Sequence, residues 1–216
     1  MKMKKSVAVL GLGKYGRSLA ENLYRLGSDV LAVDNDRKLI EEFAPKCTSA
    51  VCADLSDEEA VASLGLKDMD IVVVAMGRSL SASILSVAVA KEQGVPVVVA
   101  KSSSDRMSAI LLKVGADKIL DPEGEGGMRS ARILVSASFK DFFELDSNMY
   151  MLELIVKKEW VGKNLVELGL RNKMNLNVVA MKEPGDQWRF VDPHAPLTEQ
   201  SVLLVVMEKK DMDKWK

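Results

Sequence analysis

The feature that most constrains the fold is an alternation, within residues 6–120, of short apolar runs with segments of helical periodicity. The runs consist almost entirely of Val, Ile, Leu and Ala, whereas the segments between them place apolar residues three or four positions apart. Predicted strands cover 7–12, 29–34, 50–53, 70–75, 95–100 and 117–120, and predicted helices cover 14–26, 36–43, 57–64, 79–92 and 104–114. Apolar strands joined by helical crossovers are typical of a parallel sheet covered on both faces. We therefore predict an α/β fold, a doubly wound, Rossmann-like parallel sheet of about six strands.

The pattern changes after residue 120, which predicts a second, smaller domain. A helix is predicted over Met128–Ala137, beginning at Gly126 and Gly127, and the polar and aromatic residues 138–148 are interpreted as a linker. Beyond it, apolar runs at 151–156, 177–181, 188–191 and 202–207 and a helix-like segment at 164–170 are separated by turn signals. This pattern indicates a small α+β domain with antiparallel strands. The predicted organisation is a nucleotide-binding domain over 1–137, a linker over 138–148 and a small domain over 149–216.

Composition excludes several classes of protein. Among 216 residues, 48% are hydrophobic, and 30 Lys and Arg balance 31 Asp and Glu. A disordered chain would be less apolar, and a nucleic-acid-binding chain would normally be basic. No apolar run reaches the roughly 18 residues that a membrane-spanning helix needs. Cys47 and Cys52 are too few and too close for a disulfide framework, which fits a reducing cytoplasm, and one His with two Cys argues against a zinc site.

The sequence Gly11-Leu12-Gly13-Lys14-Tyr15-Gly16 is a G-x-G-x-x-G motif that follows a predicted strand and opens a predicted helix. In this motif the first glycine permits a tight turn, the second lets the backbone approach phosphate, and the third lets the helix pack against the strand. The helix N-terminus then offers free N–H groups to phosphate oxygens. Asp34 ends the next predicted strand, where an acid accepts hydrogen bonds from ribose hydroxyls. We predict a nucleotide-binding site here, against the alternative of a glycine turn without a ligand.

Further candidate ligand-binding residues follow the predicted strands, because ligands of such sheets bind at the carboxyl ends of the strands. They are Asn35, Asp54, Leu55, Ala75, Met76, Gly77, Lys101 and Glu123. Simpler interpretations stay open for three of them: a helix cap for Asp54, a solvated loop charge for Lys101 and a surface carboxylate for Glu123. His194, in a proline-rich turn, is interpreted as exposed.

The chain does not contain a recognisable acid–base constellation. A dehydrogenase needs such groups and a substrate pocket, usually in a larger second domain, whereas the C-terminal part offers no His, Cys or Lys–Tyr arrangement at usable spacing. We therefore predict that the chain is not an enzyme and that the nucleotide is a signal. The alternative is a small NAD-dependent oxidoreductase, in which Asp34 would favour NAD over NADP. A redox-sensing transcriptional regulator would need a DNA-binding segment, and the sequence offers none.

Several segments together resemble the RCK (regulator of potassium conductance) family. They are VAVLGLGKYGRSLAENLYRLGSDVLAVD, SLGLKDMDIVVVAMG, VGADKILDPE and SVLLVVMEKKD. The resemblance is strongest to the cytosolic KtrA/TrkA-type regulatory subunits of bacterial potassium uptake systems and spans nearly the whole chain. It implies dimers that assemble into an octameric ring, docked at the inner face of the cell membrane on a potassium translocation subunit. ATP and ADP, or NAD(H) in some relatives, would bind at the glycine loop and change the shape of the ring.

The resemblance also implies roles for individual residues. Relatives often carry Arg at the position of Lys14, where it reaches the terminal phosphate, and here Arg17 is a possible substitute. Glu123 matches a position at which relatives bind a divalent cation or sodium ion between subunits. The small domain of relatives can bind cyclic di-AMP, and Arg171, Asn177 and Pro193 stand at corresponding positions.

Overall fold

The computed structural model describes residues 4–77, 79–135 and 139–215. The chain divides into two compact units, Met1–Gly124 and Glu125–Lys216, and each is considered by itself.

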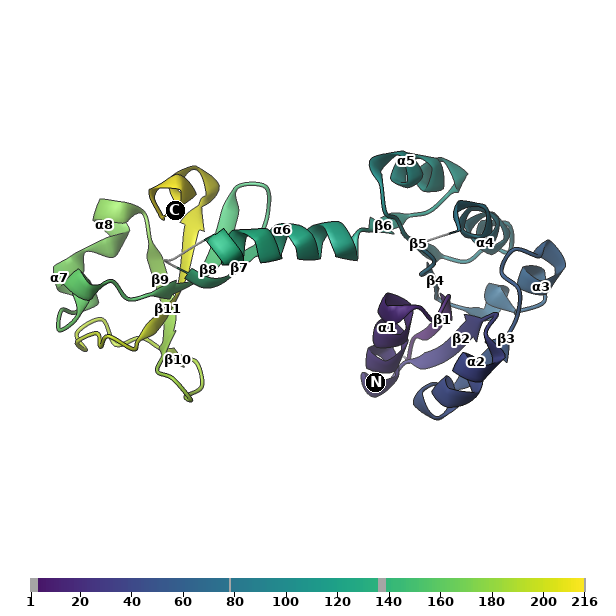
Figure 1. Cartoon of the computed structure of the whole chain (residues 1–216), viewed down its shortest axis with the longest axis horizontal. Coiled ribbons are helices and arrows are strands. Elements are labelled where there is room, and N and C mark those ends of the chain that lie inside the picture. The colour runs from purple at the N-terminus through teal and green to yellow at the C-terminus, as the bar shows by residue number, and fades with distance from the viewer. Residues whose placement is uncertain (1–3, 78, 136–138, 216) are drawn as a thin grey trace. The chain divides into compact units, whose positions relative to one another are not determined.

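The first unit is a six-stranded parallel sheet in the order β3-β2-β1-β4-β5-β6 (Figure 1), which confirms the predicted doubly wound fold. Its strands are β1 (Ser6–Leu10), β2 (Asp29–Asp34), β3 (Ser49–Cys52), β4 (Ile71–Val74), β5 (Val97–Lys101) and β6 (Lys118–Leu120). Its helices are α1 (Lys14–Arg25), α2 (Arg37–Phe43), α3 (Glu58–Ala62), α4 (Leu80–Glu92) and α5 (Asp105–Val114), and α6 (Pro122–Val135) begins at its end. Each predicted strand and helix of residues 6–120 is present, with bounds that differ by at most two residues.

Both faces of this sheet are buried, because successive side chains of each strand enter different cores. On one face, Val7 and Val9 of β1 pack with residues of α1 and α2, including Ile40 and Phe43. On the other face, Ala8 and Leu10 pack with residues of α3, α4 and α5. This double burial explains the continuous apolar strands of the sequence.

Strand β1 lies between β2 and β4, so the chain reverses its direction of travel across the sheet at this point. In register, Leu10 at the end of β1 is opposite Val33 of β2 and Val74 of β4. The loops that follow these three strands therefore meet at one edge of the sheet. In open α/β sheets this is where ligands bind.

The second unit contains a five-stranded antiparallel sheet in the order β10-β9-β11-β8-β7. Its elements are β7 (Phe139–Glu144), β8 (Met149–Ile155), α7 (Leu165–Leu168), α8 (Leu170–Met174), β9 (Asn177–Lys182), β10 (Arg189–Phe190) and β11 (Val202–Glu208), together with the later turns of α6. Buried and half-buried residues alternate along β8, as expected for a sheet with its core on one face. The predicted antiparallel α+β domain is confirmed.

Two sequence-based interpretations are wrong at the start of this unit. The stretch predicted as a linker contains β7, whose Phe142 is 4% exposed and meets the Tyr150 ring edge-on, with 5.8 Å between centroids. Helix α6 begins at Pro122 rather than at Gly126 and Gly127, which lie inside it. Proline suits a first helical turn, and the Asp121 carboxylate accepts a hydrogen bond from the Gly124 N–H (2.9 Å). The predicted helix end and linker start at 136–138 lie outside the described residues.

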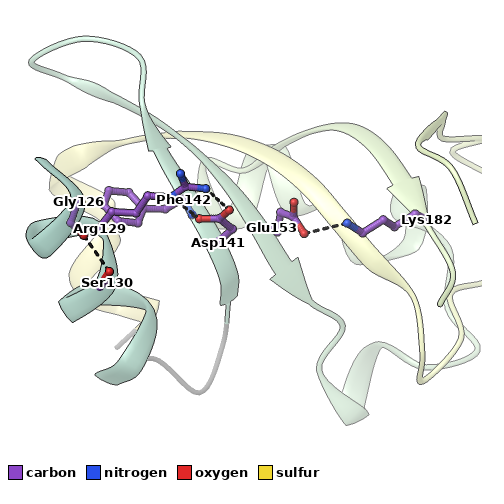
Figure 2. Close-up of polar contacts among 7 residues, drawn as sticks. All are labelled: Gly126, Arg129, Ser130, Asp141, Phe142, Glu153 and Lys182. Carbon is purple, nitrogen blue, oxygen red and sulfur yellow. Dashed lines mark hydrogen bonds and ion pairs between the residues drawn. The ribbon is translucent and has the colours of Figure 1, made fainter. Parts of the chain in front are cut away.

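One charged pair attaches α6 to this sheet, and another joins two of its strands (Figure 2). Arg129 of α6 donates hydrogen bonds to both carboxylate oxygens of Asp141 on β7, and Lys182 of β9 pairs with Glu153 of β8 at 2.9 Å. The hydrogen bonds from Arg129 hold the pKa of Asp141 below its ordinary value. The contact with Arg129 shows how a strand can hold the charged Asp141: a neighbouring helix neutralises its carboxylate.

Within the described residues, none of the helices combines the length and apolarity needed to cross a membrane.

Candidate nucleotide-binding site

The glycine motif forms a closely packed turn between β1 and α1. Gly11 has a φ of +97°, which favours glycine, and its N–H donates to the Val33 carbonyl (2.8 Å). A Cβ atom on Gly16 would lie 1.9 Å from the Gly11 carbonyl oxygen and 3.2 Å from Cβ of Ala75. Glycine at position 16 therefore allows α1 to begin directly against the turn and the end of β4.

The middle of the turn is open. Gly13 is the N-cap of α1 and supplies no side-chain hydrogen bond to the helix, and a Cβ atom placed on it would meet nothing within 4 Å. Lys14 and Arg17, both exposed, stand in the first turns of the helix. Free space, a helix N-terminus and two cations together suit a phosphate group.

Asp34 connects the end of β2 to the glycine turn. Its Oδ2 accepts a hydrogen bond from the Leu12 N–H (2.6 Å), and its Oδ1 accepts one from the Asp36 N–H (3.0 Å). Each carboxylate oxygen can accept more than one hydrogen bond, so capacity remains for the hydroxyls of a ribose. The predicted ribose acid thus lies beside the predicted phosphate turn.

Two adjoining hollows share Asp34 and Asn35. The first, of about 210 Å³, is lined by Gly11, Asp34, Asn35, Asp54, Leu55, Ser56, Met76, Ser79 and Ala82. The second, of about 530 Å³, is lined by Leu12, Gly13, Arg17, Asp34, Asn35, Asp36, Lys38, Leu39 and Glu42. The first contains six of the residues predicted from sequence and suits a base and ribose, and the second suits the phosphates.

Asp54 faces the first hollow as an anion. Its Oδ1 accepts hydrogen bonds from the hydroxyl (2.6 Å) and the N–H (2.9 Å) of Ser56, which hold its pKa below the ordinary value. The helix-cap interpretation is wrong for Asp54, because Asp57 is the N-cap of α3.

Three further candidates, Tyr15, Gly77 and Glu123, form a second group around Lys101. This side chain is buried, ion-pairs with Glu123, and has its Nζ 5.7 Å from the centroid of the Tyr15 ring. A Cβ atom on Gly77 would lie 3.2 Å from the same Nζ. The interpretation of Lys101 as a solvated loop charge is therefore wrong.

The predicted cation at Glu123 does not fit the residues of one chain. Lys101 neutralises the Glu123 carboxylate, and nowhere in the described part of the chain do three His, Cys, Asp or Glu side chains gather as metal ligands. A cation between subunits, which would need carboxylates from another copy, stays a prediction.

The second unit has a pocket of its own, of about 440 Å³. It is lined by Met149, Arg171, Asn172, Asn175, Asn177, Met207 and Glu208. Of the three residues predicted for cyclic di-AMP, Arg171 and Asn177 line this pocket. Pro193 is not among its lining residues, and its carbonyl accepts a hydrogen bond from the Val166 N–H (3.3 Å).

Sequence reasoning missed Lys38, Ser56 and Ser79 as lining residues. Ser56 and Ser79 follow β3 and β4 by a few residues, and Ser79 is the N-cap of α4, accepting from the Ala82 N–H (3.3 Å). Their positions after strand ends were a usable signal. Lys38 lies inside α2, and the helical pattern gives no sign that it faces the glycine turn.

The parallel sheet, the open glycine turn and the acid at the end of β2 define a Rossmann-like nucleotide-binding domain. The family model for the TrkA-N domain matches residues 7–122. The Ktr system potassium uptake protein C of Bacillus subtilis (strain 168) is 34% identical over 99% of this chain and 96% of its own length. The Ktr system potassium uptake protein A of Vibrio alginolyticus is 35% identical over 94% of this chain and 92% of its own. The chain therefore belongs to the TrkA-N, or RCK, family and is homologous to Ktr potassium uptake regulatory proteins.

Solved structures show the same fold. The RCK domain of GsuK superimposes with a TM-score of 0.69 at 16% identity, covering 98% of this chain and 47% of that one. The GsuK channel bound to NAD superimposes with a TM-score of 0.67 at 16% identity, covering 97% of this chain and 38% of that one. This chain thus spans less than half the length of these structural neighbours.

The packing of the turn predicts opposite results for two glycine substitutions. Gly16→Ala should lower the free energy of unfolding by at least about 2 kcal/mol, because its Cβ atom overlaps the Gly11 carbonyl. Gly13→Ala should change stability by less than about 1 kcal/mol, because its Cβ atom meets open space. It should nevertheless weaken nucleotide binding about tenfold or more, since the methyl group lies where a phosphate must approach. Denaturant unfolding measures the stability of the two variants, and calorimetric titration measures their affinity for nucleotide. A Gly13→Ala variant that binds as tightly as wild type would contradict the assignment of the phosphate turn.

Proposed function

We propose that this chain is a nucleotide-binding regulatory subunit that gates a bacterial potassium uptake system. The observation that carries the proposal is the open turn at Gly13 beside the Asp34 carboxylate, in a chain homologous to Ktr proteins along nearly its whole length. The turn supplies a phosphate site, the carboxylate a ribose site and the hollow at Asp54 a base site.

ATP and ADP are the proposed ligands. They differ in one terminal phosphate, and the cations that could recognise it are Lys14, which follows Gly13 in the chain, and Arg17 and Lys38, which line the second hollow. Lysine keeps the charge of arginine but lacks the two-pronged hydrogen bonding of a guanidinium group, so Arg17 completes the recognition. NAD or NADH is the alternative ligand, and the fold shared with the NAD-bound GsuK channel supports that class of molecule.

The nucleotide acts as a signal rather than as a reagent. The lining of the first hollow contains two aspartates and two serines, and no His, Cys, Lys or Tyr among its described residues. A hydride transfer to a substrate would need a proton donor or acceptor beside the reacting carbon. The two carboxylates already accept hydrogen bonds within the protein, Asp34 from the Leu12 N–H and Asp54 from Ser56. This composition supports a binding role over the oxidoreductase alternative.

Gating follows from unequal binding to two conformations. A ligand shifts a conformational equilibrium only by the difference between its affinities for the two states. We propose that the chain acts at the cytoplasmic face of the membrane, as a dimer that assembles into an octameric ring on a potassium translocation subunit. A cation shared between subunits at Glu123 would then depend on assembly.

Removing either the ribose acid or the phosphate cation should abolish the response to nucleotide. We expect Asp34→Ala and Lys14→Ala to lose at least about tenfold in affinity for ATP and ADP, because hydrogen bonds to charged groups contribute about 1.5–3 kcal/mol each. Isothermal titration calorimetry measures the affinities, and circular dichroism checks that the variants are folded.

The other end of β2 offers a matched control. Asp29→Ala removes a carboxylate from the first residue of the same strand, away from the hollows, and should leave affinity unchanged. Normal binding of ATP and ADP by both Asp34→Ala and Lys14→Ala would overturn the site assignment.

Cyclic di-AMP is the proposed ligand of the pocket in the second unit. Arg171 can pair with a phosphate, and the amides of Asn172, Asn175 and Asn177 can bond to the edges of a purine. The Asn175 side chain is held in place by a hydrogen bond to the buried Asp211 (3.2 Å). The resemblance of this domain to its relatives supports the same ligand.

Arg171→Ala should weaken cyclic di-AMP binding about tenfold or more, because it removes the guanidinium that lines the pocket. Lys173→Ala, a change on the same helix outside the lining, should have no effect. Titration calorimetry of both variants tests this, and equal affinities for the two would show that the pocket is not the binding site.

A further inference from the structure

We propose that Glu123 competes with the bound nucleotide for Lys101, so that ligand binding breaks the Lys101–Glu123 pair and releases the first turn of α6. This inference rests on the proposed function and names how that site is regulated.

The position of the Lys101 ammonium carries the inference. Lys101 ends β5, and its side chain is only 10% exposed. The ammonium lies between three elements: the Tyr15 ring of α1 at 5.7 Å, the backbone at Gly77 after β4, and the Glu123 carboxylate. Two of these three elements, α1 and the loop after β4, also form the nucleotide site.

The two side chains of the pair differ in burial, and this difference determines which of them can leave the ion pair. Glu123 is 64% exposed, so its carboxylate can turn into water at little cost, whereas the Lys101 ammonium would stay buried without a counter-ion. A buried cation released by its partner needs another anion. A phosphate at the glycine turn is the anion that the proposed function supplies.

The pair also holds a helix end. Glu123 is the second residue of α6, and the neighbouring Gly124 N–H is bonded to Asp121 (2.9 Å). With Lys101 attached, β5 and the first turn of α6 are tied together. If Lys101 instead paired with a phosphate, the first turn of α6 would lose this ion pair. Of the contacts described here for that turn, the hydrogen bond to Asp121 would remain.

A double-mutant cycle on the full-length chain tests the competition. ADP and ATP affinities are measured by titration calorimetry in EDTA, so that no divalent cation can bridge Glu123 to the nucleotide. Glu123→Gln should bind both nucleotides about two- to fivefold more tightly, the effect of removing one partly exposed ion pair. Lys101→Met should bind them more weakly, and adding Glu123→Gln to Lys101→Met should change nothing further.

Two controls separate the pair from general effects. Glu125→Gln removes the same charge from the same helix and leaves the pair intact, so it should not change affinity. Glu123→Asp, which keeps the charge on a shorter side chain, should fall between wild type and Glu123→Gln. Hydrogen exchange at the amides of residues 124–127 should become faster in wild type when nucleotide binds, and should already be faster in free Glu123→Gln.

The outcomes are distinct. Wild type that binds nucleotide, combined with a Glu123→Gln variant that binds no more tightly than Glu125→Gln, overturns this inference and leaves the proposed function standing. The inference is also overturned if Glu123→Gln raises nucleotide affinity equally in wild type and in Lys101→Met. The increase in affinity would then not depend on the ion pair with Lys101. Wild type that binds neither nucleotide overturns the proposed function and this inference together.

Discussion

The hydrogen bond from the Leu12 N–H to the Asp34 carboxylate is the contact on which the candidate site depends, because it joins the turn after β1 to the end of β2. It forms only where the turn is tight, and the turn is tight because Gly11 adopts a positive φ and Gly16 has no Cβ atom to strike the Gly11 carbonyl. Gly13 is then left facing open space at the start of α1. One short segment thus sets the packing of α1 against the ends of β1 and β4 and the shape of the phosphate site.

The fold was largely predictable from the sequence because its local signals agree with its global arrangement. Val, Ile and Leu runs mark strands buried on two faces, and the glycine motif followed by Asp34 marks the switch point. The linker interpretation failed at β7 because this edge strand, FKDFFE, mixes charged and aromatic residues. Its composition does not differ from that of a polar loop. The early start of α6 was missed because Gly126 and Gly127 are poor helix formers, and contacts such as that of Arg129 with Asp141 override propensity.

The candidate site was predictable only in part, for a related reason. Residues at the ends of strands, such as Asp34, Asp54 and Met76, come together because parallel strands end at one edge of the sheet. Pairing between side chains is not encoded in this way. Nothing in the sequence indicates that Lys101 is buried against Glu123, or that Lys38 of α2 faces the glycine turn. These charges alter what the site can recognise, and they emerge only when the elements are packed.

The central claim is that the glycine turn binds a nucleotide, and thermal stabilisation tests it most directly. The purified chain would be melted with ATP, ADP, NAD and NADH, each with and without Mg²⁺. A true ligand at 100 times its dissociation constant adds about 2.7 kcal/mol to the free energy of unfolding, which is readily seen as a higher melting temperature. The account predicts a clear increase with ATP and ADP. Stabilisation by none of the four would contradict it and leave the glycine turn a purely structural feature of the fold.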